Sequence, residues 1–91
     1  MAEVKLDNQK FYIGDPNQPD AELTFKEKDA ETIIADHTFV DEKLRGQGVA
    51  DQLFQELIQY ARNKNLKIIP ECSYIKMKME RTSEYDDVLS K

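Results

Sequence analysis

The sequence predicts an α+β domain with a mixed sheet of about five strands and two main helices. Three observations support this fold class. Short alternating segments fill the first 40 residues, a long amphipathic stretch covers about 47–63, and an apolar run at 66–69 follows it. Strands joined by short links pair antiparallel, whereas a strand–helix–strand crossover places its two strands parallel. We therefore expect an antiparallel meander that ends in a parallel strand–helix–strand unit.

Composition indicates one domain over 1–91 and limits the partners that it can take. Eighteen acidic and thirteen basic residues leave a net charge of −5, which disfavours nucleic acids and anionic membranes but suits a cationic amine. The single cysteine excludes an internal disulfide, and the sequence contains no long uncharged apolar run. These features predict a cytoplasmic protein without a signal peptide or a membrane span.

The first three strands follow from alternation and turn signals. Residues 4–6 alternate in polarity and precede the Asp-Asn turn signal at 7–8. A second strand is expected at 11–13. The Gly- and Pro-containing segment 14–20 is expected to be a loop, and strict alternation over 21–25 predicts a third strand with one solvated face.

The second half begins with a β-branched run at about 31–40, which predicts the fourth strand. The helix at about 47–63 carries one apolar stripe that we expect to be core: Leu53, Phe54, Leu57 and Ile58. Asn63 or Asn65 is suited to its left-handed C-terminal position. After the strand at 66–69, Ser73 is expected to cap a second helix that runs to about Arg81. The remaining residues, 85–91, form a polar tail.

Pro70 predicts a cleft, because a proline inside a central strand removes one donor of the ladder. The proline is tolerated if the fifth strand parts from the fourth at this point. Such a parting between parallel strands opens a cleft that is lined by backbone amides and carbonyls. Its floor is expected near the glycine-containing loop that precedes the long helix.

This loop, residues 43–50, suits a phosphate or pyrophosphate. A helix that begins in a glycine-rich loop presents unpaired N–H groups, and glycine lets an anion approach the backbone. A tight turn without a ligand is the alternative. A dinucleotide-binding loop is disfavoured because Asp51 occupies the position of its last small residue, and the Gly-Lys-Ser/Thr of a Walker-type loop is absent. Lys43 is expected to be an ordinary solvated residue.

The run from Arg45 to Ala50 matches the pattern Arg/Gln-x-x-Gly-x-Gly/Ala, and with its flanking strand and helix it resembles the acetyl-CoA-binding motif of GNAT N-acetyltransferases. The short chain, His37-Thr38 and Cys72-Ser73 are similar to the small YjdJ-type branch of that superfamily. The resemblance covers nearly the whole chain, and it implies a GNAT-like sheet with splayed strands. The expected CoA-binding core spans 32–81.

The resemblance also implies a set of residues that bind acetyl-CoA, the acyl donor and co-substrate. The pyrophosphate is expected on the backbone amides of Arg45, Gly46, Gln47, Gly48, Val49 and Ala50. The pantetheine arm is expected to pair with the strand around Phe39 and Val40, and Tyr74 flanks this arm or packs against the sheet. The early helices that close over the acceptor in longer members are lacking. The acceptor site is therefore expected to be open, or completed by a partner protein or a second copy.

Cys72 and His37 are the candidate catalytic residues. Cys72 lies between a strand end and a helix start, a location that favours a reactive thiolate, although a buried cysteine can simply fill space. His37 is the only histidine, and it can act as a base if it faces Cys72 across the cleft. Alternation places His37 on the face of Ile33, whereas a bulge would reverse that face. Glu71 is an alternative base.

The predicted function is acetyl-CoA-dependent transfer of an acetyl group to a primary amine on a small molecule or a peptide. The transfer is either direct or passes through an acetyl-cysteine at Cys72. No group of residues has metal-ligand spacing, so no metal is expected. Two alternatives remain: a CoA-binding module without catalytic activity, and a small interaction domain that shares the fold.

Overall fold

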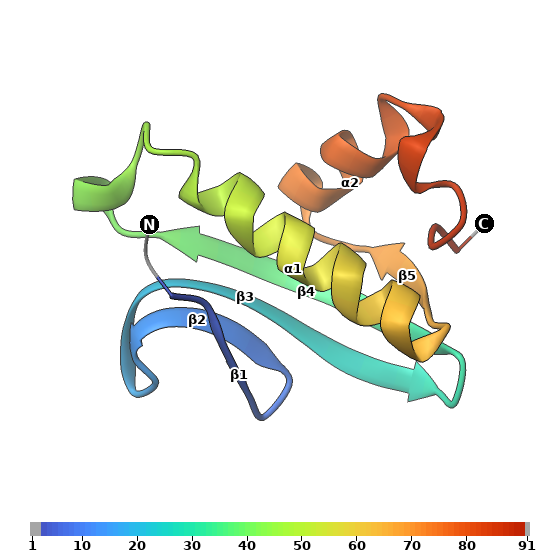
Figure 1. The fold of residues 1–91 in the computed structure, drawn as a ribbon, viewed down its shortest axis with the longest axis horizontal. Coiled ribbons are helices and arrows are strands. Elements are labelled where there is room, and N and C mark those ends of the chain that lie inside the picture. Colours follow the sequence, from blue (N-terminus) through green and yellow to red (C-terminus); the bar gives the residue numbers. More distant parts are fainter. Residues whose placement is uncertain (1–2, 91) are drawn as a thin grey trace.

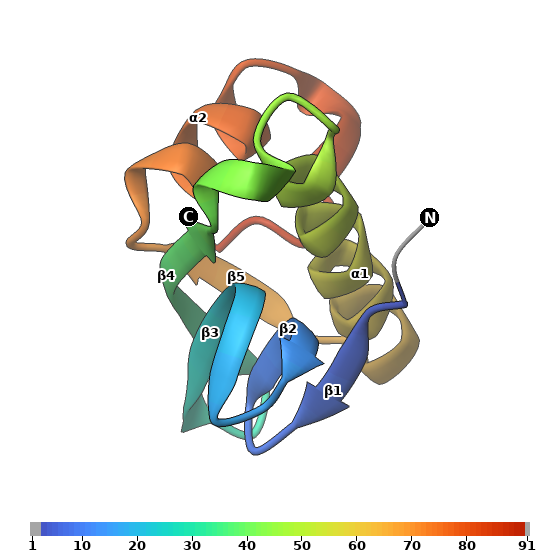
Figure 2. The same ribbon diagram turned by 90° about the vertical axis from the view of Figure 1, so that its left-hand side faces the viewer.

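A five-stranded mixed sheet with the strand order β1-β2-β3-β4-β5 forms the base of the molecule, and two helices lie above it (Figures 1 and 2). The computed structural model describes residues 3–90, so residues 1, 2 and 91 of the expected domain lie outside the described residues. The α+β class, the antiparallel meander and the parallel last pair are confirmed.

The first three strands are β1 (Lys5–Asp7), β2 (Lys10–Asp15) and β3 (Gln18–Asp29), paired antiparallel. The expected loop at 14–20 is wrong, because the ladder continues through most of it and only residues 16 and 17 lie between the strands. The Asp15 carboxylate accepts the backbone N–H of Asn17 at 2.8 Å, which closes a tight turn. The polar residues therefore make a hairpin instead of interrupting it.

The strands β4 (Thr32–Val40) and β5 (Lys67–Pro70) are parallel, and their pairing ends at Ala35 opposite Pro70. The backbone N–H groups of Glu71 and Cys72 both donate to the Ala35 carbonyl, at 2.9 and 3.1 Å. The chain then turns into the second helix. Within residues 3–90, the part of β4 that follows Ala35 pairs with β3 alone.

A bulge at Asp36 divides β4 into two halves. Thr24 of β3 lies opposite His37 and Phe25 lies opposite Ala35, so Asp36 is an extra residue in the register. Its carboxylate accepts the Thr24 hydroxyl at 2.6 Å. The bulge decides the orientation that alternation left open, because it turns His37 to the face opposite the core.

The long helix α1 (Val49–Lys64) begins at Gly48 and ends at Asn65, and both of these flanking residues adopt left-handed backbone angles. The second helix α2 (Ser73–Glu80) is preceded by Cys72 in an extended conformation, and no side chain caps it. The expected capping role of Ser73 is therefore wrong. The extended backbone continues one residue further than expected, so Ser73 is the first helical residue. Two short 3₁₀ turns, η1 (Glu42–Leu44) and η2 (Ser83–Tyr85), complete the secondary structure.

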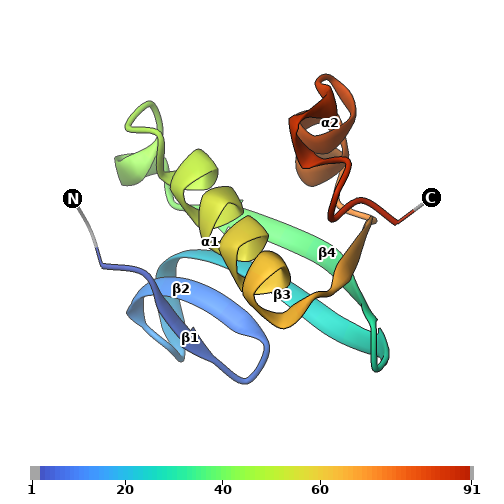
Figure 3. The ribbon, with the colours of Figure 1, turned by 45° about the vertical axis from the view of Figure 1, so that its right-hand side comes forward.

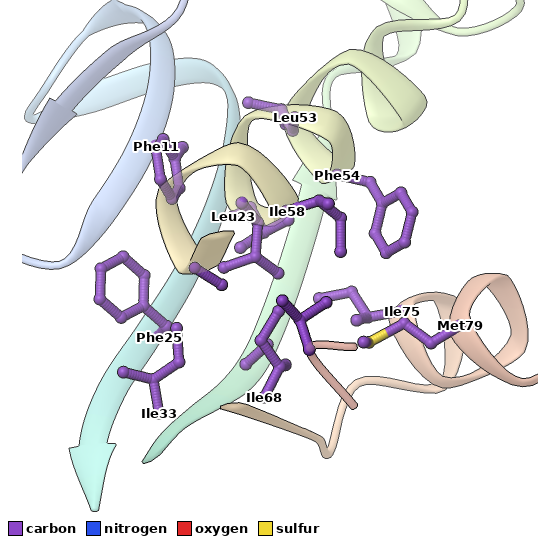
Figure 4. Packing of buried hydrophobic residues seen from close by; sticks show 14 of the residues in the cluster. Phe11, Leu23, Phe25, Ile33, Leu53, Phe54, Ile58, Ile68, Ile75 and Met79 are labelled. Carbon is purple, nitrogen blue, oxygen red and sulfur yellow. The ribbon is translucent and has the colours of Figure 1, made fainter. Parts of the chain in front are cut away.

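The core lies between the sheet and the helices (Figure 4). The apolar stripe of α1 is fully buried, as expected, and α2 adds Ile75 and Met79 to the same cluster. Phe54 packs edge-on against Tyr85, with ring centroids 5.0 Å apart. The core thereby extends from β2 across α1 to α2 and the C-terminal segment.

The C-terminal segment up to Ser90 lies along the outer side of β5 (Figure 3). The backbone N–H of Ile68 donates to the Val88 carbonyl at 2.7 Å, and Ser90 donates back to Ile68 at 2.9 Å. The Arg62 guanidinium of α1 pairs with Asp87 at 2.9 Å. β5 is thus covered on the edge that faces away from β4.

Candidate functional site

The loop before α1 presents its backbone. Gly46 has φ +80° and Gly48 has φ +75°, values that side chains rarely tolerate. A Cβ atom built at either position meets nothing within 4 Å, so no neighbouring group excludes a side chain there. The two glycines are needed for backbone conformation, and the space beside them is open to a ligand.

The N-terminus of α1 carries unpaired donors toward this space. The first N–H groups of a helix have no partner within the helix, and Gly48 supplies no side-chain cap. The helix dipole adds positive potential at the same end. This arrangement binds anions.

A pocket of about 190 Å³ lies where the end of β4, the loop, the first turn of α1 and the start of α2 meet. Most of the residues expected to bind the cofactor line it: Val40, Arg45, Gly46, Gly48, Val49, Ala50 and Tyr74. Leu44 and Asp51 complete the lining and were not among the expected residues. Their sequence signal was their position, since each directly flanks the motif.

Two of the expected cofactor residues lie elsewhere. Gln47 lines a neighbouring groove of about 420 Å³ along the solvent side of α1, and its side-chain amide donates to the Lys43 carbonyl at 3.2 Å. Phe39 lies opposite Glu22 in the ladder and remains 39% exposed. Because the bulge reverses this part of β4, the Phe39 side chain points away from the pocket.

The basic residues of the loop have different partners. Arg45 Nε donates to the Val40 carbonyl at 3.4 Å, which brings the guanidinium to the rim of the pocket. Lys43 instead pairs with Asp20 at 3.0 Å, and this hydrogen bond raises the pKa of Lys43. The ammonium group of Lys43 is exposed and paired, as expected for a solvated loop residue.

Cys72 and Thr38 meet at the open edge of β4. The half-buried Cys72 thiol donates to the Thr38 hydroxyl, with Sγ and Oγ1 3.5 Å apart. Thr38 lies opposite the buried Leu23, so it faces the helices. The thiol therefore lies beside the part of β4 that β5 leaves unpaired.

His37 and Cys72 are not brought together. The imidazole Nε2 of His37 lies 3.4 Å from the Glu22 carboxylate, and its side chain is 54% exposed. Thr38 and His37 are successive residues, so their side chains point to opposite faces of β4. The structure therefore places Cys72 and His37 on opposite faces of the strand.

Tyr74 lines the pocket from α2, and burial raises the pKa of its phenol, so the hydroxyl is a proton donor at neutral pH.

No group of three or more potential ligands for a metal ion occurs among residues 3–90. None of the helices in this part of the chain is both long and apolar enough to cross a bilayer.

Comparisons with known proteins agree with the fold. The family model described as GCN5-related N-acetyl-transferase matches residues 10–88. A GCN5-like protein from Staphylococcus aureus, solved by NMR, is 42% identical, with a TM-score of 0.82 over 98% of this chain and 88% of that chain. No curated protein matches the chain.

A second solved structure is a GNAT family acetyltransferase from Elizabethkingia anophelis with acetyl-CoA bound. It is 22% identical, with a TM-score of 0.59, and the match covers 79% of this chain and 50% of that one. At this identity the likeness concerns the fold alone. The family model, by contrast, covers most of the chain, and the chain belongs to the GCN5-related N-acetyltransferases, a family of acyltransferases.

Proposed function

We propose that this protein transfers the acetyl group of acetyl-CoA to a primary amine. The observation that carries the proposal is the continuity between the pocket at the start of α1 and the unpaired edge of β4, because Val40 belongs to both. A pyrophosphate and an extended amide-bearing arm need these two features side by side. The neighbour from Elizabethkingia anophelis, which has this fold, holds acetyl-CoA.

In the proposed complex, the backbone amides of residues 45–50 bind the pyrophosphate. Arg45 at the rim adds a positive charge, and the dipole of α1 favours the anion. Thr38 and Val40 of β4 offer backbone groups on the side that β5 has left, and the pantetheine amides pair with them as an additional strand would. Val40 also contributes its side chain, whereas the register pairs the backbone of Phe39 with Glu22 of β3.

The arm extends from the glycine loop toward the end of β5, which brings the thioester close to Cys72. In direct transfer, the nitrogen of a neutral amine attacks the thioester carbonyl and forms the C–N bond. The C–S bond then breaks, CoA leaves as a thiolate, and the amine proton passes to a base. An N–H group of the splayed backbone stabilises the oxyanion that forms on the carbonyl oxygen.

In the alternative route, the Cys72 sulfur attacks first and carries the acetyl group as a thioester. CoA thiolate leaves, and the amine then takes the acetyl group from Cys72. The thiol proton passes to a solvent base, relayed by the Thr38 hydroxyl that is its hydrogen-bond partner or by a water molecule. Tyr74 can return a proton to the departing CoA thiolate in either route, since its raised pKa keeps the hydroxyl protonated.

We propose that His37 acts on the acceptor rather than on Cys72. Its imidazole lies on the outer face of β4, paired with Glu22, where an ammonium group can approach from solvent. The end of the β4–β5 ladder at Ala35 supports this proposal, because β5 does not pair with the strand beside His37. The acceptor is a small molecule or a peptide, and a partner protein or a second copy would complete its site. The single cysteine favours a cytoplasmic location.

The test is turnover of acetyl-CoA by the full chain with a panel of polyamines, small amines, amino-terminal peptides and lysine peptides. Free CoA and acetylated product should form together with at least one amine class. Saturable CoA binding without turnover across the panel favours a non-catalytic module, and absence of binding contradicts the proposal. Intact mass after mixing with acetyl-CoA decides the route. An adduct that is lost in Cys72→Ala supports the acetyl-cysteine, and no adduct supports direct transfer.

A further inference from the structure

Asp51 is a negative charge at the place where the diphosphate is proposed to bind. It belongs to the first turn of α1 and lines both the pocket and the neighbouring groove. An acidic residue near a helix N-terminus stabilises the helix, but it repels an anionic ligand at the same end. Its side chain is 47% exposed, so its charge faces the ligand side as well as the protein.

Lys78 of α2 holds this carboxylate. Its Nζ lies 2.5 Å from Asp51 Oδ1 and 5.6 Å from the centroid of the Phe54 ring, and its side chain is only 16% exposed. The hydrogen bond to Asp51 raises the pKa of Lys78, so the ammonium stays charged at neutral pH. Lys78 also stands one helical turn after Tyr74, which lines the pocket.

We propose that Lys78 is a positioning residue for the acyl donor: it neutralises Asp51 and draws the carboxylate toward α2, so that the N-terminus of α1 accepts a diphosphate. This inference rests on the proposed function. Lys78 is not part of the pocket lining, so it acts through Asp51 and not by direct contact with the ligand. The negative charge of Asp51 still stabilises the N-terminus of α1, but the ligand meets an ion pair that has no net charge.

A purely structural ion pair between the two helices makes different predictions. If the pair only braces α2 against α1, Lys78→Met and Asp51→Asn should weaken donor binding alike, and the double variant should resemble either one. If Lys78 neutralises Asp51, the two single variants should act in opposite directions. The double variant should then recover the affinity that Lys78→Met loses.

The experiment is calorimetric titration of acetyl-CoA into the wild type, Lys78→Met, Lys78→Arg, Asp51→Asn and the double variant. We expect Lys78→Met to weaken binding about five- to tenfold, because it leaves an unpaired carboxylate beside the phosphates. Asp51→Asn should bind at least as tightly as the wild type. The acetyl-CoA affinities of the double variant and of Lys78→Arg should lie within about threefold of the wild-type affinity. Methionine keeps the apolar stem of the lysine, so packing changes little.

A phosphate-free probe separates charge from shape. S-acetylpantetheine lacks the diphosphate, so its affinity should be the same for the wild type and Lys78→Met. Two results would overturn the role of Lys78 without affecting the proposal that acetyl-CoA binds. One is weaker acetyl-CoA binding by Asp51→Asn than by the wild type. The other is a double variant that has the thermal stability of the wild type but binds acetyl-CoA as weakly as Lys78→Met. If the folded wild type does not bind acetyl-CoA, the proposed function fails first, and this inference fails with it.

Discussion

The two halves of β4 differ in what surrounds them. From Thr32 to Ala35 the strand is paired with β3 on one side and β5 on the other, and Ile33 and Ala35 are fully buried. After the bulge at Asp36, β3 is the one strand that pairs with it in the described part of the chain, and the side chains are exposed or half-buried. The first half therefore holds the fold together, whereas the second half leaves backbone groups for a ligand.

The same contrast is repeated along α1. Its C-terminal end is capped by Asn65, and the ion pair between Arg62 and Asp87 connects this end to the C-terminal segment. Its N-terminal end begins at Gly48 beside a pocket. We therefore propose that the strand and the helix each use one end for stability and one end for binding, and the two proposed binding ends line the same pocket. Substitutions can test whether these two roles are separable.

The largest expected effect is on stability, in the closed half of β4. Ile33→Ala should lower the free energy of unfolding by about 2–5 kcal/mol, because it leaves a cavity in a fully buried site. Phe39→Ala, in the open half, should cost about 1 kcal/mol or less, since its ring is 39% exposed. Chemical denaturation of both variants measures the difference.

Acetyl-CoA binding provides the control for this pair. Phe39→Ala should keep the donor affinity of the wild type, because the Phe39 side chain points away from the proposed site. Equal stability losses in the two variants would contradict the division of β4 into a structural half and a binding half.

The next effect separates the two ends of α1. Gly48→Ala should weaken acetyl-CoA binding about tenfold or more, and should cost about 1–2 kcal/mol of stability, because φ +75° strains alanine and its methyl group enters the ligand space. Asn65→Ala, at φ +57° on the other end, should cost about 1 kcal/mol and leave binding unchanged. Titration calorimetry and thermal melting measure both quantities. If Asn65→Ala lost affinity as Gly48→Ala does, general destabilisation would explain both results.

The smallest effect concerns the covered edge of β5, and it depends on pH. The guanidinium of Arg62 holds the pKa of Asp87 below its ordinary value of 3.8. A depressed folded-state pKa adds stability above the unfolded pKa, and this stability is lost as pH falls through the folded value. The melting temperature of Asp87→Asn should therefore lie slightly below that of the wild type at neutral pH, and the gap should close below about pH 3.8. A gap that stays constant at low pH would show that the pair with Arg62 is not its source.

The sequence was a good guide where one local pattern decides the outcome. The apolar stripe of α1 and the cation-rich helix end before Asn65 follow from spacing and capping alone. The splay at Pro70 follows from a missing donor, and the ladder does end there. The glycine loop was predictable as a backbone feature, since Gly46 and Gly48 both adopt positive φ before α1, and its binding of an anion stays a prediction.

The rest depends on contacts between distant residues. The bulge at Asp36 is created by the register with β3, and periodicity within β4 could not decide it, so the face of His37 was uncertain. The hairpin over 14–20 was missed because its glycine, proline and polar residues are typical of a loop. In the structure most of them belong to the ladder between β2 and β3. The ion pair between Asp51 and Lys78 joins two helices and has no signal in either one alone.

The most direct test of the central claim is an amide-resolved NMR titration of the wild type with CoA. We expect the largest shifts at the backbone amides of residues 45–50, followed by residues 38–40, with little change at 32–35 and at the far end of α1. That result would place the diphosphate on the glycine loop and the arm on the open half of β4. Saturable shifts centred on another surface, or none from a folded protein, would contradict it.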